Sequence, residues 1–173
     1  MNVISFYDSD RQAHWLAEIG KSDWSAGRYL HDLLQNGTFF DAVGAGSKVL
    51  LLINGDALVS FCTYAEKDDI QPTALSPWMG FVYTFPAYRG HRYMKKLFDE
   101  VERLAKTQGV SEVYISTDTV GLYEKYGCVL RTKMKDLYGQ WSNVYVKPIN
   151  GEGGMNHDRR RAFINADEIH IHF

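Results

Sequence analysis

The stretch of residues 78–108 constrains the fold more than any other part of the sequence. An apolar and aromatic run typical of a strand occupies residues 78–85 and stops at Pro86. Over residues 91–108, apolar side chains recur at the spacing of one helix face, and charged side chains fill the other face. The apolar positions are Met94, Leu97, Phe98, Val101, Leu104 and Ala105. An amphipathic helix directly after a strand predicts a layered α/β domain.

The elements predicted around this stretch indicate a mixed sheet. Asn54-Gly55 lies between two apolar runs, favours positive φ at both positions and predicts a tight hairpin. Strands are predicted at residues 2–7, 48–53, 57–65, 112–117, 128–134 and 143–147, and helices after residues 8–10, after Ser22 or Asp23, and at residues 120–126. Antiparallel hairpins in the first half and a strand–helix–strand crossover in the second half predict an α/β fold with helices on the faces of the sheet.

The glycine-rich residues 151–154 predict a flexible link. They suggest one domain of residues 1–149 and a C-terminal extension of residues 150–173. Residues 169–173 alternate like a strand, and we hypothesise that they add to a second copy of the chain in a homodimer. His170 and His172 share one face of this strand, but no third ligand lies at a fixed spacing, so we expect no metal site.

Charge and hydropathy exclude several classes of protein. The formal net charge of −2 argues against a general nucleic-acid coat and against binding to anionic membranes. The longest apolar run, residues 49–53, is far too short to span a bilayer, and no basic segment leads into an apolar one at the N-terminus. The two cysteines, Cys62 and Cys128, form neither a disulfide framework nor a CxxC zinc motif. We therefore expect a cytoplasmic protein with free thiols and without nucleic-acid or membrane partners.

The turn before the long helix has the features of a phosphate site. The first turn of a helix leaves about four main-chain N–H groups without internal partners, and the helix dipole places positive charge there. Gly90 allows the main chain to approach a ligand closely, and Arg89, Arg92, Lys95 and Lys96 add positive charge. Residues 89–94 therefore predict a phosphate or pyrophosphate site, although an ordinary turn with solvated charges fits the same residues.

Two motifs resemble the GCN5-related N-acetyltransferase (GNAT) superfamily. Residues 88–97 are similar to its acetyl-CoA-binding motif, Gln/Arg-x-x-Gly-x-Gly/Ala, with Arg89 at the first position and Arg92 and Met94 at the two small-residue positions. Residues 119–128 resemble a later segment in which a short helix with Leu-Tyr-Glu-Lys precedes Gly-Phe, here Gly-Cys. One predicted helix and one strand separate the motifs, as in the family. The resemblance covers roughly residues 45–148.

This resemblance implies an acyl-CoA N-acyltransferase fold with a mixed, mostly antiparallel central sheet. It also implies that acetyl passes from acetyl-CoA to a primary amine by direct attack in a ternary complex. The acetyl-CoA co-substrate would lie where the strands of residues 78–85 and 112–117 splay apart. The residues implied to contact it are Tyr83, Thr84 and Phe85 along the pantetheine arm, Arg89, Gly90, His91, Arg92, Tyr93 and Met94 at the pyrophosphate, and Ser116 and Thr119 after the second strand.

The resemblance further implies that Tyr123 protonates the departing thiolate, with Tyr126 as the rival. A phenol has a pKa of about 10, so it is protonated at neutral pH and can donate a proton. Glu66 is the candidate base, and Asp68 and Asp69 of the same loop are alternatives.

The acceptor is predicted to be a small-molecule amine rather than a protein lysine, because nothing marks an appended recognition domain. Members of the family often build the acceptor pocket from aromatic residues of the early helices. The aromatic residues in that part of this chain are Trp15, Trp24, Tyr29, Phe39 and Phe40. Packing in the hydrophobic core explains their presence equally well. The alternative function is a non-catalytic acyl-CoA-binding regulatory module, in which Arg92 and Met94 reflect an altered site.

Overall fold

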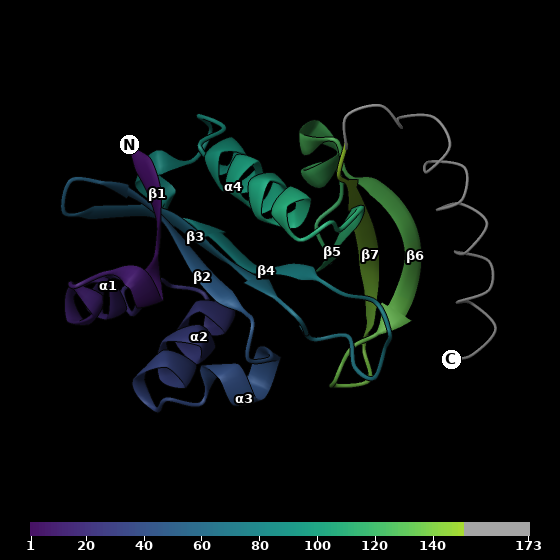
Figure 1. The fold of residues 1–173 in the computed structure, drawn as a ribbon, viewed down its shortest axis with the longest axis horizontal. Coiled ribbons are helices and arrows are strands. Elements are labelled where there is room, and N and C mark those ends of the chain that lie inside the picture. The colour runs from purple at the N-terminus through teal and green to yellow at the C-terminus, as the bar shows by residue number, and fades with distance from the viewer. Residues whose placement is uncertain (151–173) are drawn as a thin grey trace.

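The computed structural model describes residues 1–150, which form a seven-stranded mixed sheet with helices on both faces (Figure 1). The strand order is β1-β2-β3-β4-β5-β7-β6, and every neighbouring pair is antiparallel except β4 and β5. The strands are β1 (Asn2–Ser5), β2 (Lys48–Asn54), β3 (Ala57–Ala65), β4 (Trp78–Thr84), β5 (Glu112–Thr117), β6 (Val129–Lys135) and β7 (Trp141–Pro148). The predicted fold class is confirmed. The predictions of a C-terminal strand, of a homodimer formed through it and of a histidine pair concern residues outside the described part of the chain.

The helices divide between the two faces of the sheet (Figure 1). Helix α4 covers one face, and α1, α2 and α3 lie on the other. The helices are α1 (Gln12–Ile19), α2 (Ser25–Gln35), α3 (Phe39–Val43) and α4 (Met94–Thr107), and the short 3-10 helices are η1 (Phe6–Asp8), η2 (Pro86–Tyr88) and η3 (Tyr123–Tyr126). Within residues 1–150, no helix combines the length and hydrophobicity that a membrane span requires.

Strand β2 shows why the sheet is covered on both sides. Its residues 49–52 form an unbroken apolar run rather than an alternating one. Leu50 and Leu52 pack in the cluster that includes the apolar face of α4, whereas Val49 and Leu51 pack in the cluster of α1, α2 and α3. Side chains alternate across a strand, so a continuous apolar run requires a core on each face.

Several local predictions were wrong at their boundaries. The first strand, predicted over residues 2–7, ends at Ser5, because Phe6–Asp8 form η1. The long helix begins at Met94 rather than at residue 91, because Arg92 has φ 57°, which no helical residue adopts. The helix predicted over residues 120–126 is reduced to the 3-10 turn η3. Strand β2 continues through Asn54, and of the Asn54-Gly55 pair only Gly55 has positive φ, at 61°. Helix α3 was not predicted, since five residues are too few to show a helical period.

Candidate active site

A gap in the main-chain pairing between β4 and β5 defines the site. These parallel neighbours are in register only at Trp78 and Tyr114, near the start of β4. Further along, β4 pairs with β3 on its other side up to Thr84, and β5 pairs with β7 up to Thr117. The facing edges of β4 and β5 therefore separate toward their carboxyl ends. Main-chain groups on such edges need partners, which an amide-containing ligand can supply.

A β-bulge in β4 accompanies this separation. The register between β3 and β4 shifts between Phe61 and Thr63, and Phe81 in the middle of β4 has φ 48°. A bulge bends the strand that carries it and increases its local twist. We infer that the bulge turns the second half of β4 away from β5.

A cavity of about 1050 Å³ occupies the opening between the two strands. It extends from the turn before α4, past η3, to α2 and the turn between β6 and β7. The predicted site residues that line it are Tyr83, Thr84, Arg89, Gly90, Arg92, Tyr93, Met94, Ser116, Thr119 and Tyr123. Phe85, His91 and Glu66 are not among its lining residues.

The turn before α4 forms a cradle of main-chain donors, which we call the amide cradle and define as residues 90–93. Within the described residues, none of its main-chain N–H groups donates a hydrogen bond to another main-chain group. Gly90 with φ 84° and Arg92 with φ 57° flank His91, and alternating left-handed residues turn successive N–H groups toward one side. The following helix has no side-chain N-cap and no acidic residue in its first turn, so its positive dipole end is uncompensated. This geometry suits a phosphate group.

The Arg89 side chain contacts the end of β4 beside the amide cradle. Its Nε donates to the main-chain oxygen of Thr84 at 2.9 Å, and its guanidinium lies 5.4 Å from the centroid of the Tyr83 ring. The Arg89 side chain thus adds positive charge while holding the strand end in place. Met94 packs in the core beneath the cradle, with only 7% of its surface exposed.

Tyr123 on η3 lies buried between α4 and β7. Its ring centroid is 6.3 Å from that of Phe98 and 6.0 Å from that of Tyr145, and 6% of the residue is exposed. Burial raises the pKa of the Tyr123 phenol well above its usual value, and the neighbouring Cys128, Cys62 and Asp68 raise it further. The phenol is therefore protonated at neutral pH, and Tyr123 lines the cavity.

Tyr126, the rival donor, also lines the cavity. Its ring stacks on Phe98 with centroids 4.8 Å apart. Burial raises the pKa of Tyr126, and the positive charge of Arg92 opposes that rise.

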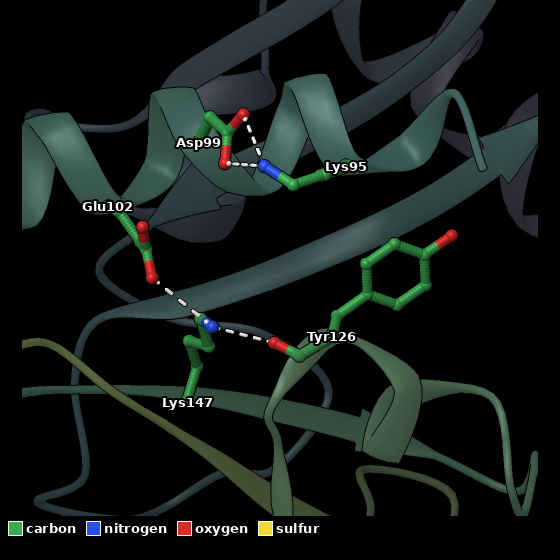
Figure 2. A network of polar contacts seen from close by, with 5 residues as sticks. All are labelled: Lys95, Asp99, Glu102, Tyr126 and Lys147. Atoms are coloured by element: carbon green, nitrogen blue, oxygen red, sulfur yellow. Dashed lines mark hydrogen bonds and ion pairs between the residues drawn. The ribbon is translucent and has the colours of Figure 1, made fainter.

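Contacts from β7 and α4 hold η3 in place (Figure 2). The Lys147 Nζ donates to the main-chain oxygen of Tyr126 at 2.6 Å and lies 3.2 Å from a carboxylate oxygen of Glu102 on α4. The Tyr145 hydroxyl donates to the Glu124 carboxylate at 2.7 Å. We call Lys147, Glu102 and the Tyr126 carbonyl the η3 clasp.

Two adjacent carboxylates, Asp68 and Asp69, line the cavity on the side of the β3–β4 loop. A Cβ at residue 80 would collide with the Asp68 carboxylate, so this carboxylate lies directly against Gly80 of β4. Burial and the charge of Asp69 raise the pKa of Asp68 to about 7. Glu66 instead is exposed, and its Oε1 accepts from the Gly46 N–H at 3.0 Å.

The end of the cavity next to α2 combines aromatic rings with the carboxylate of Asp23. Trp24 stacks on Tyr83 with ring centroids 5.7 Å apart, and the Tyr83 hydroxyl donates to Asp23 Oδ1 at 2.6 Å. Of the early-helix aromatics, Trp24 and Tyr29 line the cavity, while Trp15 and Phe39 are buried in the core.

Sequence reasoning missed Leu137 and Tyr138, which line the cavity from the β6–β7 turn. No periodicity or motif links that turn to the site. The link is tertiary, since the Leu137 N–H donates to the Asp69 carbonyl at 2.8 Å.

Comparison with known proteins identifies the family. The sequence profile of the acetyltransferase (GNAT) family matches residues 10–128. The chain belongs to this family. No curated protein sequence matches it.

Solved structures of GNAT proteins share the fold at low identity. One is an aminoglycoside 6'-N-acetyltransferase complexed with coenzyme A, with 12% identity and a TM-score of 0.62 over 89% of this chain and 100% of that one. The aminoglycoside 6'-N-acetyltransferase from Enterococcus faecium has 13% identity and a TM-score of 0.62 over 89% and 100% of the two chains. A GNAT-family protein described as a putative acetyltransferase from Desulfovibrio desulfuricans has 13% identity and a TM-score of 0.61 over 86% and 98%.

In this GNAT acetyltransferase, the two sequence motifs meet at the same cavity. The first, residues 88–97, supplies the amide cradle, and the second, residues 119–128, supplies Tyr123. Among the described residues, no group of three or more His, Cys, Asp or Glu side chains is arranged to hold a metal ion.

Proposed function

We propose that this acetyltransferase moves acetyl from acetyl-CoA to a primary amine of a small molecule, by direct attack in a ternary complex. One observation carries the proposal. A single cavity joins the free N–H groups of the amide cradle to the Tyr123 side chain and to the carboxylates of Asp68 and Asp69. A diphosphate, a thioester and an ammonium group each find complementary chemistry along that path.

The proposed place of acetyl-CoA follows from the unpaired strand edges. The diphosphate would accept hydrogen bonds from the amide cradle, at the positive end of α4. The pantetheine amides would pair with the free edge of β4 beside Tyr83 and Thr84, as an added strand does. The cavity of about 1050 Å³ is slightly larger than the range usual for small-molecule sites, about 300–1,000 Å³, which suits two substrates bound together.

The proposed reaction needs a neutral amine, a polarised thioester and a protonated leaving group. The amine nitrogen forms the new C–N bond, and the C–S bonding pair leaves on sulfur. Tyr123 donates its hydroxyl proton to that sulfur, because its raised pKa keeps the proton available at neutral pH. The protein contributes orientation and proton transfer, and the thioester contributes the driving force.

A cationic small molecule is the acceptor class that the cavity favours. Three carboxylates, those of Asp23, Asp68 and Asp69, line it, and the Trp24 and Tyr29 rings offer apolar and cation–π contact. The aminoglycoside acetyltransferases that share the fold at 12% and 13% identity are consistent with this class.

The test is amine-dependent release of coenzyme A. Purified protein is incubated with acetyl-CoA and a panel of diamines, polyamines, aminoglycosides, amino acids and a lysine peptide, and the free thiol is measured with a chromogenic disulfide. Mass spectrometry of the products locates the acetyl group. We expect turnover with at least one cationic small amine and little with the peptide. Binding of acetyl-CoA without turnover across the whole panel would instead support the non-catalytic regulatory module.

A further inference from the structure

The loop between β3 and β4 places the Asp68 carboxylate in the wall of the cavity, against Gly80 of β4. Asp68 lies against Gly80, and a Cβ at residue 80 would fall within 3.1 Å of Thr63 Oγ1 as well as on the Asp68 carboxylate. Glycine at position 80 therefore makes the room in which the carboxylate sits. Asp68 and Tyr123 line the same cavity, and after burial, Cys128 and Cys62, the charge of Asp68 also raises the pKa of Tyr123.

Hydrogen bonds hold the main-chain carbonyls of Asp68 and Asp69 in place. The Gln71 Nε2 donates to the Asp68 carbonyl at 2.7 Å, and the Leu137 N–H donates to the Asp69 carbonyl at 2.8 Å. The next residue, Ile70, is buried, with 1% of its surface exposed. A side chain on this segment is held in place by its neighbours, as a group that must meet a reacting atom requires.

The charges around Asp68 leave room for a cation. Burial, the charge of Asp69 and a side-chain hydrogen bond with Asp69 raise the pKa of Asp68. Burial and the charge of Asp136 on the β6–β7 turn raise the pKa of Asp69, whereas side-chain hydrogen bonds with Ser116 of β5 and with Asp68 lower it. No basic side chain of the described residues is among the groups that shift the pKa of Asp68. Within residues 1–150, Oδ1 of Asp69 is also buried without a hydrogen-bond partner. An ammonium group would supply the missing positive charge and the missing donor.

We propose that Asp68 is the proton acceptor for the attacking amine and that Asp69 is the residue that positions and tunes it. This inference rests on the proposed acetyl transfer. The ammonium gives one proton to the Asp68 carboxylate, and the freed lone pair forms the C–N bond as the C–S pair leaves on sulfur. Tyr123 protonates the sulfur, and the second proton shed by the nitrogen restores the Tyr123 hydroxyl. Asp68 then releases its proton to water.

The electrostatics of the pair suit this role. With its pKa raised to about 7, Asp68 is both ionised and protonated in useful amounts at neutral pH, as an efficient base should be. Glu66, the base predicted from sequence, is exposed and is engaged with the Gly46 amide.

The test compares Asp68→Asn, Asp69→Asn and Glu66→Gln with Asp10→Asn, an exposed control, using an amine that the wild type acetylates. For Asp68→Asn we expect kcat to fall by at least about 100-fold. The dissociation constant of acetyl-CoA, measured by calorimetry, should remain unchanged, which also shows that the variant folds. The rate of the wild type should rise with pH around a pKa near 7, which gives its pH–rate profile a rising limb. In Asp68→Asn this rising limb should be lost.

Asp69→Asn provides a readout that a structural role would not move. Removing its negative charge lowers the pKa of Asp68, so the rising limb should shift to lower pH. The proposal is overturned if Asp68→Asn keeps the wild-type rate and limb, if Asp69→Asn leaves the limb in place, or if Glu66→Gln alone abolishes turnover. If the wild type binds acetyl-CoA but acetylates no amine, the proposed function itself is wrong.

Discussion

Replacing Lys147 by methionine tests whether the η3 clasp holds the segment that carries Tyr123. Figure 2 shows Lys147 of β7 reaching toward both Glu102 of α4 and the carbonyl of Tyr126. The Lys147 side chain is 15% exposed, so water cannot fully replace these contacts. Hydrogen bonds to charged groups contribute about 1.5–3 kcal/mol each to stability, and methionine keeps most of the packing. Because Glu102 is 29% exposed and regains some solvation, we expect a net loss of about 2 kcal/mol.

Lys95→Met is the matched control. Lys95 and Asp99 form a pair on the surface of α4, with Nζ 3.0 Å from the carboxylate, and their side chains are 68% and 56% exposed (Figure 2). Such surface pairs contribute about 0.3–0.5 kcal/mol. In a domain of this size, 1 kcal/mol shifts Tm by about 2–4 °C, so thermal unfolding should show a drop of about 4–8 °C for Lys147→Met and under about 2 °C for Lys95→Met. Equal shifts in the two variants would refute the reasoning.

Three further outcomes follow from the same structure. Tyr123→Phe should lower kcat by about 100-fold or more while the calorimetric affinity for acetyl-CoA stays the same; unchanged turnover would move the acid role elsewhere. Burial raises the pKa of Cys62 and raises that of Cys128 to about 12, so neither thiol should react with a chromogenic disulfide at pH 8 until denaturant is added; fast labelling of the native protein would contradict this. Arg131 holds the folded-state pKa of Glu112 below its unfolded value, so the stability due to this pair is present above the unfolded pKa and is lost as pH falls through the folded one. Glu112→Gln should therefore flatten the loss of Tm at acid pH, and an unaltered acid limb would count against the pair.

The sequence predicted the parts of the site that depend on local patterns. The apolar stripe of α4 and the proline that ends β4 are readable because helix periodicity and turn chemistry act within a few residues. Gly90 before the helix marked the place of the amide cradle for the same reason. Even here the exact start of the helix was wrong, because a positive φ at a non-glycine such as Arg92 has no signal in the sequence.

Tertiary contacts determined the rest. The separation of β4 from β5 was implied only by the family resemblance, and the bulge at Phe81 is invisible in a run that reads as an ordinary strand. Among three acidic residues in one loop, the sequence prediction put Glu66 before Asp68 and Asp69, although no local signal separates them. Which of them faces the cavity depends on Gly80, which adjoins Asp68, and on Gly46, which engages Glu66. Tyr138 could not be found at all, since the β6–β7 turn reaches the site only through the fold.

Calorimetric titration with acetyl-CoA and with acetyl-pantetheine tests the central claim most directly. The second compound keeps the thioester and the arm but lacks the diphosphate that the amide cradle would hold. We expect saturable heat with acetyl-CoA and at least about tenfold weaker binding, equal to about 1.4 kcal/mol, for acetyl-pantetheine. Equal affinities for the two compounds, or no heat with acetyl-CoA and a folded protein, would contradict the account.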